Sequence, residues 1–91
     1  MEKAIISVIG KDTVGILAKV AAICADRSVN VLEVTQNVLQ DNLFAMIMIV
    51  DITTISVGFS EFADTLSKTG SDLGLDIKAM HEEIFNSMHK I

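Results

Sequence analysis

Hydrophobic periodicity divides the chain into six main elements. Four segments have the short apolar or alternating patterns that are typical of β-strands, at residues 4–9, 31–39, 43–50 and 75–80. Apolar residues at helical spacing lie between them, from Val14 to Ala25 and from Phe59 to Leu73. The order is therefore β-α-β-β-α-β, and the final residues 82–91 predict a short amphipathic C-terminal helix.

This order predicts an α+β, ferredoxin-like fold with a four-stranded antiparallel sheet. Right-handed crossovers place both helices on one face of the sheet, with the first and third strands inside. Those two strands, "AIISVI" and "LFAMIMIV", are apolar on both faces, as central strands are. Two helices cover only one face, so we expect the C-terminal segment, a second subunit, or both to cover the other.

Composition favours one domain over residues 1–91 that associates with itself. The chain is 51% hydrophobic but only 4% aromatic, and a domain of this size buries only about 60% of its unfolded surface. Some aliphatic side chains are therefore expected at a subunit interface, which predicts a homodimer. The strand at residues 31–39 is an edge without proline or lysine, so edge pairing is favoured over face pairing.

Charge and motif content exclude several classes of protein. The net charge of −5 and scattered basic residues argue against a nucleic-acid partner. The longest uncharged apolar run has eight residues, too few to span a membrane. The N-terminal segment lacks the features of a secretory signal, and Cys24 is the single cysteine. These features predict a soluble cytoplasmic protein.

The turn "GKDTVG", residues 10–15, is the candidate ligand site. With a helix starting at about Thr13 or Val14, the backbone N–H groups near Gly15, Ile16 and Leu17 lack intrahelical acceptors. Together with the helix dipole they favour a carboxylate. Asp12 offers a partner for an ammonium group, so an α-amino acid fits both ends. The alternative is that Asp12 or Thr13 only caps the helix.

Two amides of the second strand are further candidates. Asn30 and Gln36 share a parity along the strand, and both offer hydrogen bonds to a ligand at a subunit interface. The alternatives are that Asn30 ends the helix in a left-handed conformation and that Gln36 keeps an edge strand soluble.

The remaining reactive residues predict neither catalysis nor a metal or cofactor site. Cys24 lies on the apolar helical face without a His or Lys nearby in sequence, so it is interpreted as a core residue. On one helix, His81 and His89 stand about 12 Å apart, too far to share an ion. Met46 and Met48 are interpreted as packing residues. We therefore expect a protein that is not an enzyme.

The segment "IGKDTVGILAKVAAICADRSVNVLEVTQNVL" resembles the first half of an ACT domain. The pattern of that family is a strand, an Asp-x-Pro-Gly turn, a helix and a second strand opened by Asn. Asp12, Gly15, Asn30 and Gln36 match it, whereas Val14 stands where proline is common. The resemblance covers the whole chain and, with "FAMIMIVDI" and "EEIFNSMHKI", is greatest to small bacterial and archaeal proteins that consist of a single ACT domain.

ACT domains commonly bind amino acids between paired domains, so the resemblance implies a regulatory homodimer that binds an amino acid. The alternative is a protein-interaction module without a ligand, which uses the exposed sheet face or edge strand.

Overall fold

The computed structural model describes residues 1–11 and 14–88 and contains four strands and three α-helices in that part of the chain. They are β1 (Lys3–Lys11), α1 (Ile16–Asp26), β2 (Asn30–Val38), β3 (Leu43–Asp51), α2 (Phe59–Leu73), β4 (Leu75–His81) and α3 (Glu82–Met88). A short 3-10 turn at Gln40–Asn42 joins β2 to β3, with Asp41 and Asn42 at positive φ.

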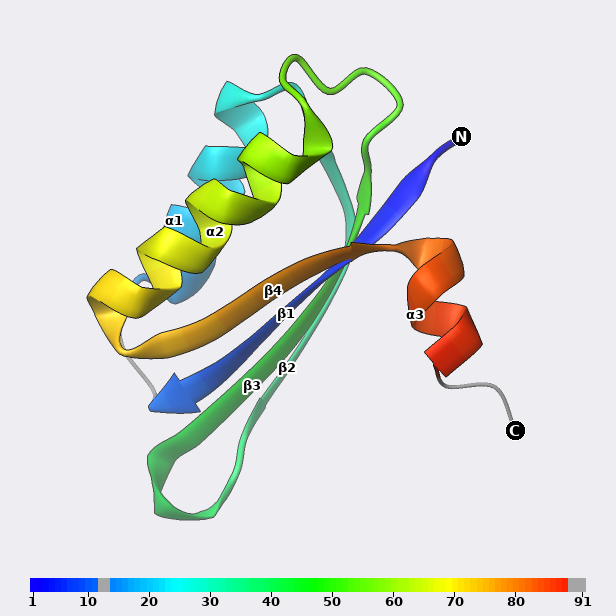
Figure 1. The fold of residues 1–91 in the computed structure, drawn as a ribbon. Helices are drawn as coiled ribbons and strands as arrows, with labels where there is room; N and C mark the ends of the chain where they lie inside the picture. Colours follow the sequence, from blue (N-terminus) through cyan, green and yellow to red (C-terminus); the bar gives the residue numbers. More distant parts are fainter. Residues whose placement is uncertain (12–13, 89–91) are drawn as a thin grey trace.

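The four strands form one antiparallel sheet in the order β2-β3-β1-β4. Helices α1 and α2 lie side by side over one face, whereas α3 lies on the other side of the sheet (Figure 1). The predicted β-α-β-β-α-β order, the antiparallel sheet and the inner position of β1 and β3 are confirmed. The tip of the β2–β3 hairpin projects beyond the helix layer (Figure 1).

The main core fills the space between the sheet and the helices α1 and α2. Alternate residues of the two central strands point into it, and they are Ala4, Ile6, Val8, Phe44, Met46, Met48 and Val50. Phe62 and Leu66 of α2 close the core from above and are fully buried. The packing interpretation of Met46 and Met48 is confirmed, since they are 1% and 0% exposed.

Helix α1 begins later in the chain than its pattern predicts. Its first residue is Ile16, because Gly15 has a φ of +84° and cannot continue a right-handed helix. Val14 therefore lies outside the helix and is 98% exposed. The buried side is formed by Ile16, Val20 and Cys24, so the prediction that Val14 belongs to the buried stripe is wrong.

Strand β2 contains a bulge that reverses its side-chain alternation. Val31 pairs with Val50, but the next paired residue, Glu33, lies opposite Ile49, so Leu32 is the extra residue. Beyond such a bulge, side chains point to the other face from the one that simple alternation gives. The predicted common parity of Asn30 and Gln36 therefore does not place them on one face.

Helix α2 packs closely on β4 through Gly70. A Cβ atom at Gly70 would lie 2.8 Å from both Ile77 Cγ1 and the Leu75 carbonyl oxygen. The helix continues through Gly70 to Leu73 and is ended by Gly74, which has a φ of +73°. The helix therefore ends where its apolar pattern ends, and Gly74 is a left-handed C-terminal cap.

Candidate functional site

The N-terminus of α1 is built around Gly15. This N-cap residue is exposed and left-handed, and it makes no side-chain hydrogen bond to the helix. The Lys19 N–H donates to the Gly15 carbonyl oxygen at 3.0 Å, which is the first turn of hydrogen bonding in the helix. The N–H groups of Ile16, Leu17 and Ala18 precede it and have no acceptor within the helix.

These N–H groups and the helix dipole give this end of α1 a partial positive charge, equivalent to about half an elementary charge. A carboxylate is the group that such an end binds best. Ile16 is buried and Leu17 packs against the core, so their side chains hold the helix in place and only their backbone N–H groups are left for contact with a ligand. Asp12 and Thr13, the two polar residues predicted at this turn, lie outside the described residues.

Gln36 lies on the helix-covered face of β2, towards the same end of the sheet. It pairs with Met46, a core residue of β3, and Val34 and Val38 pair with Met48 and Phe44 on the same face. Gln36 itself is exposed. Its neighbour Val38 is 59% exposed, because the hairpin extends beyond α1 and α2 there. The structure therefore places Gln36 and Gly15 in one half of the molecule.

Asn30 lies at the opposite end of the sheet. It is the first residue of β2 and pairs with Asp51, which in turn pairs with Lys3 at the start of β1. Gly15, in contrast, follows the end of β1. Asn30 is not the left-handed helix stop of the alternative interpretation either, because the positive φ of 59° belongs to Ser28. One chain alone does not bring Asn30 to the N-terminus of α1.

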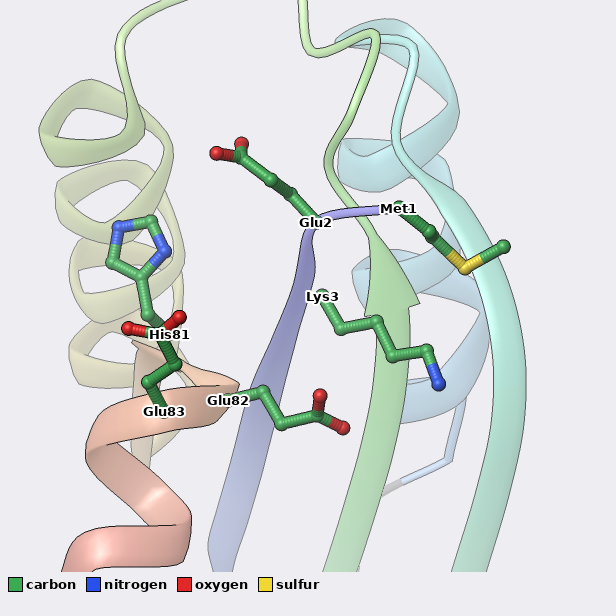
Figure 2. Close-up of a pocket in the computed structure, with 6 residues that line it drawn as sticks. All are labelled: Met1, Glu2, Lys3, His81, Glu82 and Glu83. Atoms are coloured by element: carbon green, nitrogen blue, oxygen red, sulfur yellow. The ribbon is translucent and has the colours of Figure 1, made fainter.

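A surface hollow of about 180 Å³ lies at the end of the sheet where β2 begins with Asn30, and not at the end where β1 leads to Gly15. Its wall comes from the start of β1 and the junction of β4 with α3 (Figure 2). The lining residues are Met1, Glu2, Lys3, His81, Glu82 and Glu83. None of the predicted site residues lines it, and sequence reasoning missed the cluster because the pairing of β1 with β4 alone brings these two segments together.

The N-terminal wall of this hollow is held by the turn after β3. The Thr53 hydroxyl accepts a hydrogen bond from the Glu2 N–H at 2.8 Å and donates one to the Asp51 carboxylate at 2.6 Å. The Thr53 side chain and backbone N–H together hold the pKa of Asp51 below its ordinary value. This network fixes the chain before β1 and is interpreted as structural.

The remaining candidate residues have packing roles. Cys24 is fully buried, and burial raises the pKa of its thiol to about 11, which keeps it protonated. The ring of His81 stacks on Phe59 of α2, with the centroids 4.2 Å apart.

Over residues 1–11 and 14–88, no cluster of His, Cys, Asp or Glu has the arrangement of a metal site. No helix in this part of the chain is long and apolar enough to cross a membrane.

Comparison with known proteins gives consistent matches along the chain. The family model described as "ACT domain" matches residues 4–70. The UPF0237 protein of Methanocaldococcus jannaschii is 42% identical over 91 residues, with both chains covered completely. The UPF0237 protein of Clostridium acetobutylicum is 44% identical over 89 residues, which is 98% of this chain and 99% of the relative.

Solved structures with the same fold include an ACT domain protein from Streptococcus pneumoniae. It is 32% identical, with a TM-score of 0.78 over 92% of this chain and 93% of its own. The regulatory subunit of aspartate kinase from Thermus thermophilus is 25% identical, with a TM-score of 0.64 over 87% of this chain and 50% of its own.

Proposed function

The chain belongs to the ACT domain family, and on that basis we propose that it is a regulatory domain that binds an amino acid as a homodimer. The observation that carries the proposal is the N-terminus of α1, where a left-handed Gly15 leaves the first N–H groups without a side-chain cap from the N-cap residue. The likeness to an aspartate kinase regulatory subunit supports a regulatory role. The proposed role is binding without catalysis, in the cytoplasm.

The two charged groups of the amino acid bind to different parts of the proposed site. Its carboxylate accepts hydrogen bonds from the N–H groups of Ile16 and Leu17, beside Gly15, which has no Cβ to obstruct the approach. Its ammonium pairs with the Asp12 carboxylate. The side-chain amide of Gln36, exposed on the same half of the molecule, contributes a further hydrogen bond.

A second subunit would bring Asn30 to the same end of the sheet as this site. Strand β2 is an edge of the sheet, so its outer N–H and C=O groups are open to pairing with another strand. In an antiparallel pair of two β2 strands related by a two-fold axis, the start of one strand lies beside the end of the other. Asn30 of the second copy then lies next to Val38 and the hairpin tip, at the end where α1 begins, with its side chain on the face opposite Gln36, so that Asn30 lies beside the site without contacting the N-terminus of α1.

A thermal-shift screen of the full chain with each of the twenty amino acids tests the proposal. A ligand at 100 times its Kd stabilises the folded state by about 2.7 kcal/mol. For a domain of this size, that corresponds to a rise in Tm of roughly 10 °C or more. Asp12→Asn supplies the variant, because Asn has nearly the same size and shape as Asp but carries no charge for the ammonium, and because the N-cap of α1 is Gly15. We expect this variant to lose the ligand-induced rise and to keep the unliganded Tm.

A protein-interaction module without a ligand is the second candidate. The observation that favours it is the exposed apolar surface on the sheet face opposite α1 and α2, where Ile9 is 50% exposed and Ile47 is 39% exposed. This candidate replaces the first if no amino acid changes the Tm of the unmutated protein. A reproducible turnover of a small molecule, lost on mutating one site residue, would contradict both.

A further inference from the structure

The sheet face opposite α1 and α2, called the open face below, is apolar along its middle. Residues of β1 and β3 that alternate with the core residues point to it, and the apolar ones are Ile5, Ile9, Leu43, Ala45, Ile47 and Ile49. Charged side chains of this face lie at its margins: Lys78 and Asp76 of the edge strand β4 form an ion pair at 3.8 Å, and the central strands carry charges at their ends, at Lys3, Lys11 and Asp51. The centre of the open face is therefore an apolar surface with a polar rim.

Helix α3 covers one end of the open face. It contacts β1 and β4, and Ile5 of β1 is only 4% exposed although it lies outside the core beneath α1 and α2. Ile9 is four residues farther along the strand, a distance of about 13 Å. A helix of seven residues is only about 10 Å long. The other end of the face therefore stays uncovered, and Ile9, Leu43 and Ile47 are 50%, 39% and 39% exposed.

The outer side of α3 is apolar as well. Ile84 and Met88 are four residues apart, on one side of the helix, and are 52% and 66% exposed. Phe85, on another side, is partly buried. Apolar residues on more than one side are typical of a helix that is covered on both sides. The exposed pair Ile84 and Met88 on α3 therefore lies next to the uncovered apolar part of the sheet.

We propose that a second copy of this chain covers the open face, with its α3 lying on the end that carries Ile9 and Ile47. A two-fold axis across the strands places each α3 on the uncovered end of the other sheet. The two α3 helices then fill one layer between the two sheets. Each open end receives the apolar outer side of α3 from the other copy, so both exposed surfaces are buried by one symmetric contact.

The size of the surface suits a stable contact. Three strands of nine residues and one of seven, at about 3.3 Å per residue and about 4.8 Å between strands, give a face of roughly 30 by 19 Å. Two such faces, each formed by the uncovered end of the sheet and by the outer side of α3 over the other end, bury roughly 1,100 Å², above the ~1,000 Å² expected of a specific interface. The contact is separate from the β2 edge. If both are used, their two-fold axes are perpendicular and produce a closed tetramer. The inference thus deepens the proposed self-association and does not depend on a ligand.

Sedimentation velocity of the full chain tests the proposal with two variants, Ile9→Glu on the sheet and Ile84→Glu on α3. Both positions are half-exposed in one chain, so a charge there is compatible with folding, which circular dichroism checks. Ala22→Glu, at an exposed position of α1, adds the same charge on the helix layer and is the matched control.

We expect each interface variant to weaken association roughly 100-fold, because a carboxylate is buried in an apolar contact, and the control to keep the mass of the unmutated protein. A monomeric unmutated protein overturns the proposal, as does a mass that either interface variant leaves unchanged. An amino-acid thermal shift that persists in Ile9→Glu shows that the ligand site and this contact are independent.

Discussion

Gln36 of β2 lies opposite Met46 of β3, so its amide stands on the same face as the hydrophobic core although its side chain is exposed. Its neighbour Asn37 lies opposite Ala45 and points to the other face. The side-chain amides of two adjacent residues on one edge strand thus lie on opposite faces of the sheet. Only the Gln36 amide is on the side of α1.

Gln36→Leu is expected to weaken amino-acid binding by a factor of roughly 2 to 10, the effect of losing one hydrogen bond of 0.5–1.5 kcal/mol. The free energy of unfolding should change little, because Val34 and Val38 lie on the same face of β2 and give a leucine at position 36 apolar neighbours. Asn37→Leu removes the same group from the opposite face and is the control. Calorimetric titration measures both, and equal effects of the two substitutions would contradict the assignment of Gln36 to the site.

Gly15→Val is expected to lower stability by about 1–2 kcal/mol, because a β-branched residue does not tolerate the φ of +84° found at this position. Gly15→Asn should cost less, since Asn adopts the left-handed conformation more readily. Gly58 provides the control: it is the N-cap of α2 but has a φ of −63° and open space around it. Urea unfolding of Gly58→Val should therefore show a clearly smaller loss, and an equal loss would refute the role of backbone conformation.

Gly70→Ala is expected to destabilise the protein by about 1–3 kcal/mol. Helix propensity alone predicts the opposite sign, a gain of about 1 kcal/mol. The added Cβ would lie 2.8 Å from the Leu75 carbonyl oxygen, which is backbone and cannot rotate away. Ser67→Ala, at an exposed position of the same helix, serves as the control for propensity. A Gly70→Ala protein that is more stable than the unmutated protein would show that α2 and β4 can move apart without a loss in the free energy of unfolding.

The stability of the protein is expected to fall in alkaline solution because of Cys24. Burial raises the pKa of its thiol from 9.0 to about 11, so between these values the unfolded chain loses a proton that the folded chain keeps. The stabilisation that comes from keeping this thiol protonated is complete below pH 9. It is lost as the pH rises towards 11, by at most about 1.4 kcal/mol for each pH unit. Urea unfolding at pH 8 and pH 10.5 measures it, and Cys24→Ala should show a smaller decrease, which isolates the thiol from the lysines.

The sequence predicts the fold well because its strongest signals are local. The strands "AIISVI" and "LFAMIMIV" are apolar on both faces, and this property alone places them in the centre of the sheet, where β1 and β3 lie. The turn at residues 40–42 is equally clear, since Asp41 and Asn42 are residue types that tolerate positive φ and both adopt it.

The candidate site is less predictable because two single residues change the geometry around it. Gly15 adopts a left-handed conformation and delays the helix to Ile16, whereas the apolar pattern includes Val14 in the helix. The bulge at Leu32 reverses the alternation of β2 and separates Asn30 from Gln36. Backbone conformation of this kind leaves little trace in hydrophobic periodicity, which reports only which side chains are apolar.

The amide resonances of the protein give the most direct test of the proposed site. A ¹⁵N–¹H spectrum is recorded during titration with the amino acid that raises the Tm most. We predict the largest shifts at the backbone N–H groups of Gly15, Ile16 and Leu17, with a further change at the side-chain amide of Gln36. Shifts that are confined instead to Lys3, Glu82 and Glu83, around the hollow at the other end of the sheet, would contradict a ligand site at the N-terminus of α1.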